Sequence, residues 1–216
     1  MFEVVLFCLV TSVIFFSAGI FFERNLLIFK QSNENIAITL LYGFIFISFL
    51  SLIINFFLPI SKNVNSIFCF FFIGYFILQA FSFKNVKKIV FFFLIISFFL
   101  SLIIILADPN RPDAGLYHFP YTKIINENKI ILGASNIHFR FGHTSILQYL
   151  NGFNLNFLFN ETGILIPQAL IVISPIIYIF VEYQNNIINK DEQLLKLFLF
   201  FVIIFFIYSY NRYGSF

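Results

Sequence analysis

The chain has 216 residues, of which 60% are hydrophobic, 22% aromatic and only 11% charged, and its mean hydropathy is +0.94. Soluble domains carry about 25% charged residues and cannot bury this much apolar surface. The composition therefore excludes a soluble enzyme, a disordered tail and a nucleic-acid-binding module. The net charge of +3 is spread between apolar blocks, so it bears on membrane orientation more than on attraction to a polyanion.

The residue usage also has a simple genomic explanation. Thirty-seven Phe residues with no Trp are typical of an A/T-rich genome, because Phe, Ile, Asn and Lys have A/T-rich codons. The two cysteines, Cys8 and Cys69, each lie inside an apolar run. We expect both to be buried and to pack as small hydrophobic side chains. Two such cysteines predict neither a disulfide framework nor a cysteine metal site.

Six apolar runs are long enough, or nearly so, to cross a bilayer as helices, since about 20 apolar residues are needed. They are residues 2–22, 36–59, 67–83, 89–107, 163–183 and 194–210. The runs lack the alternation of barrel strands, so the predicted fold class is all-α, a polytopic transmembrane helix bundle. We expect four helices in residues 1–107, a loop at 108–162, and two helices with an outer tail in 163–216.

Basic residues in the short connections favour one orientation. Seven basic residues lie on one side of the predicted spans: Arg24, Lys30, Lys84, Lys87, Lys88, Lys190 and Lys196. Only Lys62 and Arg212 lie in the short segments of the other side. This asymmetry predicts a multi-pass membrane protein with the 108–162 loop outside the cytoplasm.

The 108–162 loop is too long to lack structure of its own, and its apolar spacing predicts two short amphipathic helices. The first predicted helix contains the apolar residues Leu116, Phe119 and Ile124. The second contains Ile146 and Leu150, with Thr144 as a possible N-cap. We expect both to lie along the membrane surface with the apolar face down.

The polar chemistry of the chain is concentrated in this loop. It contains all three histidines, and its strings Asp108 to Pro120 and Asn136 to His143 hold two carboxylates, two guanidiniums and a phenol. Arg and His side chains can bind a phosphate while a carboxylate takes a proton from a hydroxyl. The combination favours transfer of a group from a lipid phosphate, and the residues alone do not identify that group.

Each of these residues also has an ordinary structural interpretation. Asp108 is most simply a turn residue before Pro109, and Asp113 could cap a helix. His118 could be a solvated surface residue, and Arg140 an anchor to anionic lipid. His138 and His143 do not have the spacing of a helical zinc site, so no metal site is predicted.

Other motifs are absent from the sequence. It contains no Walker A, G-x-G-x-x-G or G-x-S-x-G pattern, so an ATPase, a dinucleotide enzyme and an α/β-hydrolase lack support. Ionisable residues are scarce within the runs, which weighs against a proton pump or an ion channel. Pro167 and Pro175 are expected to kink the fifth run.

The string Asp113-Ala-Gly-Leu-Tyr-His-Phe-Pro120 resembles the first extracytoplasmic loop of bacterial membrane glycosyltransferases of the GT-C fold. The string Gly133 to His143 is similar to a subgroup of uncharacterised proteins related to that fold. The resemblance covers about 40 residues closely and the spans only generically. It implies that this chain is an N-terminal portion of a longer enzyme and that it lies in a bacterial inner (cytoplasmic) membrane.

The resemblance also implies site residues and partners. Asp113 would be the catalytic residue, and the substrate contacts would come from Arg111, Tyr117, His118, Arg140 and His143. The implied reaction is an inverting displacement from a polyprenyl-phosphate-linked sugar to a glycan or lipid acceptor in cell-envelope polysaccharide synthesis. No cofactor is established; some members of the family use a divalent metal, and this sequence offers no ligand set for one.

Two alternatives remain open at this point. The chain could be a non-catalytic membrane subunit or carrier that binds a lipid-linked saccharide without turnover, acting with a partner membrane subunit. A polysaccharide polymerase or flippase is less favoured. A flippase needs a polar cavity that reaches the bilayer midplane, and ionisable residues are scarce within these apolar runs. Membrane lipids are partners in every case, and nucleic acid in none.

Overall fold

A computed structural model gives the fold of residues 2–26, 36–81, 86–106, 114–142, 145–185, 198, 200–202 and 204–205, which are the residues described below. Their elements, in chain order, are all helical: α1 (Phe2–Asn25), α2 (Ile36–Phe57), α3 (Lys62–Ala80), α4 (Val86–Leu106), the π-turn η1 (Ala114–His118), α5 (Phe119–Glu127), the 3-10 turns η2 (Ala134–Asn136) and η3 (Phe139–Gly142), α6 (Ile146–Phe153), η4 (Asn160–Leu165) and α7 (Ile166–Asn185). The all-α fold class is therefore confirmed for this part of the chain.

Among the residues that the structure describes, four helices are long and apolar enough to cross a membrane: Phe2–Asn25, Ile36–Phe57, Lys62–Ala80 and Asn160–Ile179. They correspond to the first, second, third and fifth predicted spans. The fourth predicted span lies in α4, whose apolar stretch Ile89–Leu102 is shorter than those four. The sixth, at 194–210, lies mostly outside the described residues, so six spans remain a prediction.

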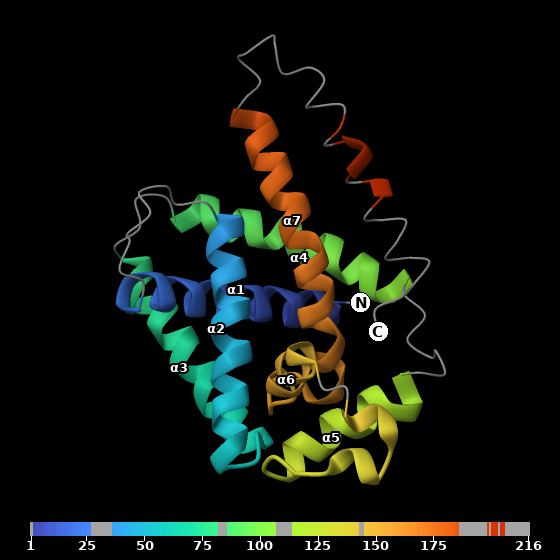
Figure 1. Cartoon of the computed structure of the whole chain (residues 1–216). Helices are drawn as coiled ribbons and strands as arrows, with labels where there is room; N and C mark the ends of the chain where they lie inside the picture. The colour runs from blue at the N-terminus through green and yellow to red at the C-terminus, as the bar shows by residue number, and fades with distance from the viewer. Residues whose placement is uncertain are drawn as a thin grey trace.

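The helix α1 is at the centre of the bundle and packs against α2, α3, α4 and α7. In Figure 1, α2 and α7 run up the page whereas α1 and α4 run from side to side. Where α1 crosses α2, Gly19 and Gly43 bring the two backbones together: a Cβ on Gly19 would lie 1.8 Å from the Thr39 carbonyl oxygen, and one on Gly43 would lie 1.9 Å from that of Phe15. Only glycine fits at this crossing, as at the close helix contacts common in membranes.

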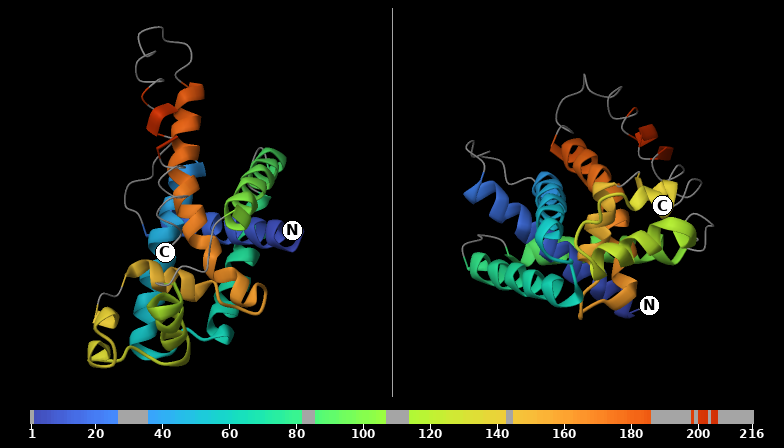
Figure 2. Two further views of the ribbon diagram at one scale, coloured as in Figure 1. Left: turned by 90° about the vertical axis from the view of Figure 1, so that its right-hand side faces the viewer. Right: turned by 60° about the horizontal axis from the view of Figure 1, so that its bottom comes forward.

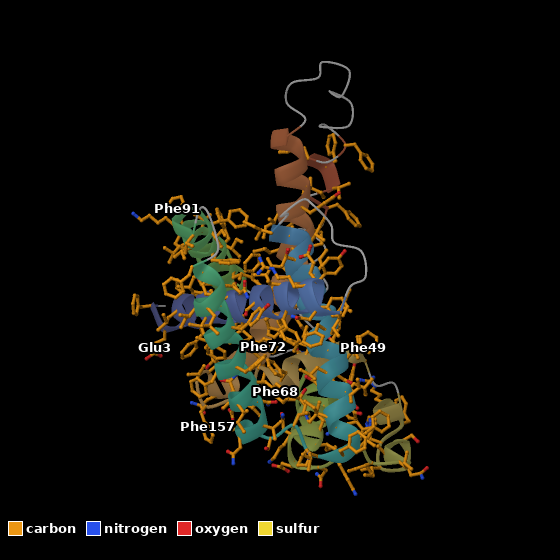
Figure 3. The ribbon with its side chains drawn as sticks, turned by 90° about the vertical axis from the view of Figure 1, so that its left-hand side faces the viewer. Glu3, Phe49, Phe68, Phe72, Phe91 and Phe157 are labelled. Carbon is orange, nitrogen blue, oxygen red and sulfur yellow. The ribbon has the colours of Figure 1, made fainter. Side chains whose placement is uncertain are left out.

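Phenylalanine supplies both the core and the outer surface. Phe15, Phe72 and Phe93 are fully or almost fully buried, whereas more than half of Phe49 and Phe91 is exposed. Figure 3 shows the latter two at the outside of the bundle and Phe72 inside it. An apolar exterior of this kind is what a bilayer solvates, and it agrees with helices that are long and apolar enough to cross a membrane.

The second half of the chain places short helices at one end of this bundle. Figure 2 shows α5 gathered with η2 and η3 beside the end of α2 and the start of α3. Backbone hydrogen bonds join the parts: Ile60 N donates to Ile125 O at 3.1 Å, and Ile130 N to Asn55 O at 2.9 Å. The α5 region is therefore held against the end of α2 and the α2–α3 connection.

One local expectation differs from the structure. The N-cap of α6 is Ser145, whose hydroxyl accepts from Leu147 N, and Thr144 lies outside the described residues. Six of the eight residues of α6 are buried, and α6 packs against α2, α5 and α7, so its position along the membrane surface stays a prediction.

The two prolines of the fifth predicted span both lie in α7. Pro167 is the second residue of α7 and directly follows η4, while Pro175 lies inside the helix.

Candidate functional site

Three of the six predicted site residues come together at η1 and η3. The guanidinium carbon of Arg140 lies 4.7 Å from the centroid of the Tyr117 ring and 5.6 Å from that of Phe139. The Tyr117 and His118 rings lie side by side, with centroids 4.0 Å apart. Tyr117, His118 and Arg140, which we call the loop cluster, thus join the two strings, since Arg140 comes 22 positions after His118 in the sequence.

The loop cluster is oriented by its neighbours. Thr122 Oγ1 donates to the His118 carbonyl oxygen at 2.9 Å, which ties η1 to the first turn of α5. Gln148 Nε2 lies 3.5 Å from His118 Nδ1. Since an amide Nε2 can only donate, a hydrogen bond at this contact requires His118 Nδ1 to be unprotonated.

The amide of Gln148 is itself fixed by the start of α6. Its Oε1 accepts from Ser145 N at 3.0 Å, as the returning half of a capping box. The oxygen is therefore turned toward the helix end and the nitrogen toward His118. This second support for the loop cluster was not expected from the sequence, although the Ser145-x-x-Gln148 spacing signals it.

The other three predicted residues, Asp113, Arg111 and His143, lie outside the described residues, as does Asp108. Asp113 directly precedes Ala114, the first residue of η1, and His143 directly follows Gly142, the last of η3.

The remaining histidine, His138, has a local role. Its Nδ1 accepts from Arg140 N at 3.3 Å, and its ring stacks on Phe139 with centroids 5.0 Å apart. Within the described residues no group of three or more His, Cys, Asp or Glu side chains is placed to hold a metal ion. His138 thus shapes the turn that carries Arg140.

Buried asparagines hold the loop onto the bundle, and sequence reasoning missed them. Asn65 Nδ2, on α3, lies within 2.9 Å of the carbonyl oxygens of Ile60 and Gly152 and 2.7 Å from that of Leu155. Asn126 Nδ2, on α5, reaches the same oxygens of Ile60 and Gly152. Two amides thus satisfy carbonyls from both the α2–α3 connection and the end of α6.

Further asparagines repeat this pattern. Asn55 Nδ2 donates to Ile125 O at 3.1 Å and to Asn128 O at 2.9 Å, so α2 holds the end of α5. Asn154 Nδ2 donates to Gly163 O at 2.7 Å. We call the set Asn55, Asn65, Asn126 and Asn154 the asparagine scaffold. Its members are all at least nine-tenths buried.

A small aromatic core lies between the loop cluster and the scaffold. Tyr121, Phe141 and Tyr149 are buried together, and the Tyr121 and Phe141 rings are 5.7 Å apart. Burial raises the pKa of Tyr149, and a hydrogen bond to Tyr121 opposes part of that rise. Tyr149 is therefore neutral at physiological pH and acts in packing.

A cavity of about 640 Å³ lies on the other side of α5. Its lining combines charged, polar and apolar side chains: Lys62, Phe119, Thr122, Lys123, Asn126, Glu127, Leu155, Glu161, Ile164 and Leu165. Its volume falls in the range of about 300–1,000 Å³ that small-molecule sites occupy. No residue of the loop cluster is among those that line it.

Large apolar side chains are exposed in the segment that carries the loop cluster. Leu132 is 92% exposed, Ile137 69% and Phe139 68%, and Leu116 of η1 is also exposed. Phe139 directly precedes Arg140, so a guanidinium lies among side chains that suit an acyl or prenyl chain. The arrangement can bind an anionic headgroup attached to a lipid.

The family of the chain carries no assigned activity. A family model described as a domain of unknown function (DUF8201) matches residues 1–215. No curated protein matches the chain, and neither does any solved structure. The function must therefore be argued from the site itself.

Proposed function

The chain belongs to the DUF8201 family, and we propose that it acts as a membrane glycosyltransferase, or as the N-terminal portion of one. In this proposal it transfers a sugar from a polyprenyl-phosphate donor to a glycan or lipid acceptor outside the cytoplasm. The observation that carries the proposal is the position of Arg140 over the Tyr117 ring, beside His118 and among exposed apolar side chains.

Stacking and phosphate binding by Arg140 are compatible. A ring contacts the face of a guanidinium, whereas a phosphate binds along its N–H edge. The stacked ring restricts the orientation of Arg140, so less rotamer freedom is lost when a phosphate binds. His118, whose ring lies beside the Tyr117 ring, adds an imidazole to the loop cluster.

Asp113 supplies the remaining chemistry in the proposed reaction. The acceptor hydroxyl gives its proton to the Asp113 carboxylate, and the hydroxyl oxygen attacks the anomeric carbon from the face opposite the phosphate. The bond between that carbon and the phosphate oxygen breaks, and the lipid phosphate leaves with the electron pair beside Arg140. One carboxylate suffices for this single inverting displacement.

The membrane arrangement is part of the proposal. If the chain has six spans and its basic connections lie in the cytoplasm, residues 108–162 lie on the outer side of a bacterial cytoplasmic membrane. The loop then contacts lipid-linked sugars at the outer surface of the bilayer, where the helices end.

A specific observation favours a second candidate, a carrier or membrane subunit that binds a lipid-linked saccharide without transfer. The described members of the loop cluster are an arginine, a histidine and a tyrosine, which are groups that bind phosphate. Binding of a lipid phosphate needs no more than these three side chains, whereas sugar transfer also needs the Asp113 carboxylate.

The experiment is transfer of labelled sugar from a panel of polyprenyl-phosphate hexoses by membranes that contain the chain. Asp113→Asn should lower the rate at least about 100-fold, the usual contribution of a general base. Asp108→Asn, which changes the other aspartate of the loop, should leave it within about twofold. Unchanged transfer by Asp113→Asn would remove the assigned base, and saturable binding without any transfer would establish the carrier instead.

A further inference from the structure

Gln148, on the first turn of α6, faces the histidine of the loop cluster. Its Nε2 lies 3.5 Å from His118 Nδ1. Only 5% of the surface of Gln148 is exposed, so water has little access to compete for its amide. The contact joins a buried helix start to a side chain that the proposed function uses.

The amide of Gln148 cannot reverse without breaking the start of α6. Ser145 Oγ accepts from Leu147 N at 3.2 Å while Gln148 Oε1 accepts from Ser145 N at 3.0 Å, so the capping box is closed from both sides. In a reversed amide the NH2 group would face the N–H of Ser145, and two donors would oppose one another. The Nε2 atom therefore stays turned toward His118.

The direction of this contact determines where the His118 ring carries its proton. An amide nitrogen only donates, so the contact is favourable when His118 Nδ1 has a lone pair. The neutral ring then carries its single proton on Nε2, which points away from the amide. Because a phosphate oxygen only accepts, a ring with an Nε2–H donor is the neutral form that binds a phosphate.

We infer that Gln148 is a positioning residue that holds His118 as a hydrogen-bond donor at Nε2. The ligand of that donor, the phosphate of a lipid, rests on the proposed function, whereas the proton position is a property of the protein alone. The guanidinium of Arg140 donates in every state. With His118 in this form, both side chains offer the phosphate a donor.

NMR of the ¹⁵N-labelled histidine rings, on the full chain in nanodiscs, tests the inference. At about pH 8 a histidine with an ordinary pKa of about 6.5 is neutral, and the chemical shifts of its two nitrogens show which one carries the proton. The His118 signals are assigned by their absence from His118→Gln. We expect an unprotonated Nδ1 and a protonated Nε2 on His118 in the unaltered chain.

Gln148→Glu reverses the direction of the contact and keeps the cap. A glutamate closes a capping box as a glutamine does, and its second carboxylate oxygen accepts where the amide donated. The ratio of protonated to unprotonated Nδ1 on His118 should therefore rise at least about tenfold at the same pH. If Gln148 served only to cap α6, the His118 spectrum would not change.

Two controls accompany this variant. His138 is an internal control, because its Nδ1 accepts from Arg140 N at 3.3 Å and should stay unprotonated in both proteins. Gln79→Glu makes the same chemical change on α3, where Gln79 accepts from Arg24. That variant should leave the His118 spectrum as it is in the unaltered chain.

A protonated Nδ1 on His118 in the unaltered chain, or the same His118 spectrum in Gln148→Glu and Gln79→Glu, would overturn the inference. The first result needs no variant, so it decides even where Gln148→Glu does not fold. Added short-chain polyprenyl phosphate should shift the Nε2 resonance of His118, and phosphate binding that leaves Nε2 unshifted would contradict the assigned donor. A chain that shows the expected proton position but binds no phosphate would contradict the proposed function alone.

Discussion

At the scale of single residues, the described parts of the 108–162 segment are held by amides that reach main-chain carbonyls. A buried carbonyl without a donor costs about 1–3 kcal/mol. Asn65 lies within hydrogen-bonding distance of three such oxygens from two parts of the chain. The amide side chain suits this position because its two N–H groups are uncharged and can be buried at low cost once they are paired.

Replacing Asn65 with alanine should lower the free energy of unfolding by about 2 kcal/mol, because at least the Leu155 carbonyl loses its donor. For a chain of this size we expect a fall in Tm of about 4–8 °C. Cys8 and Cys69 are buried, so a thiol-reactive dye reports unfolding directly.

The matched control is Asn128→Ala, which removes an exposed amide of the same kind. Its Tm should stay within about 1 °C of the unaltered chain, as is usual for surface substitutions. Equal Tm values for Asn65→Ala and Asn128→Ala would contradict the role assigned to the asparagine scaffold.

Sequence reasoning could not identify the asparagine scaffold, for a physical reason. Asn65 and Asn126 act on carbonyls up to 90 positions away, and no local period or motif marks such a pairing. A/T-rich codons also gave a sufficient explanation for abundant asparagine. The available signal was positional: Asn55 is an amide in an otherwise apolar run, and Asn65 lies just after a proline turn.

The loop cluster was partly predictable. Tyr117, His118 and Arg140 were selected from two separate strings, and the structure brings them together. Their chemical roles remain predictions. Gln148 and Phe139 were not predicted as site residues. Their contacts with His118 and Arg140 arise only from the fold, and no sequence motif marks them.

At the scale of elements, hydropathy predicts helices well because a bilayer requires every backbone group to be paired within the segment. Four long helices appear where the first, second, third and fifth apolar runs were predicted. Hydropathy does not predict how closely two helices approach one another. The α1–α2 crossing depends instead on two glycines, Gly19 and Gly43, that let the backbones touch.

Gly19→Ala should therefore destabilise the bundle strongly, by about 3 kcal/mol or more, since its Cβ would lie 1.8 Å from the Thr39 carbonyl oxygen and the helices must separate. The same dye assay measures the fall in Tm. Gly74→Ala on α3 is the control, because a Cβ there meets no atom within 4 Å. That variant should be neutral or slightly more stable, given the higher helix propensity of alanine. A Tm for Gly19→Ala at or above that of Gly74→Ala would show that the crossing does not need glycine.

At the scale of the whole molecule, the orientation in the membrane decides which substrates the loop cluster can meet. We predict that Leu132, which is 92% exposed, faces outward. Leu132→Cys should react with a membrane-impermeant maleimide in intact spheroplasts. Lys87→Cys, at the exposed start of α4, should react only after permeabilisation.

The buried native cysteines make the unaltered chain a suitable blank for this labelling. The reverse pattern, with Lys87→Cys labelled in intact spheroplasts and Leu132→Cys protected, would place the loop in the cytoplasm. The loop cluster would then bind donor sugars at the cytoplasmic surface of the membrane.

Both candidate functions require one event in common, which is binding of a lipid phosphate at Arg140. The most direct measurement is the affinity of the purified chain for a short-chain polyprenyl phosphate, with the corresponding polyprenol as the uncharged control. We predict saturable binding of the phosphate that weakens at least about tenfold in Arg140→Gln, because a charged hydrogen bond contributes about 1.5–3 kcal/mol. Polyprenol binding should be weak and unaffected by that change. Equal affinity for phosphate and polyprenol, or an unchanged affinity in Arg140→Gln, would contradict the assignment of the loop cluster as a lipid-phosphate site.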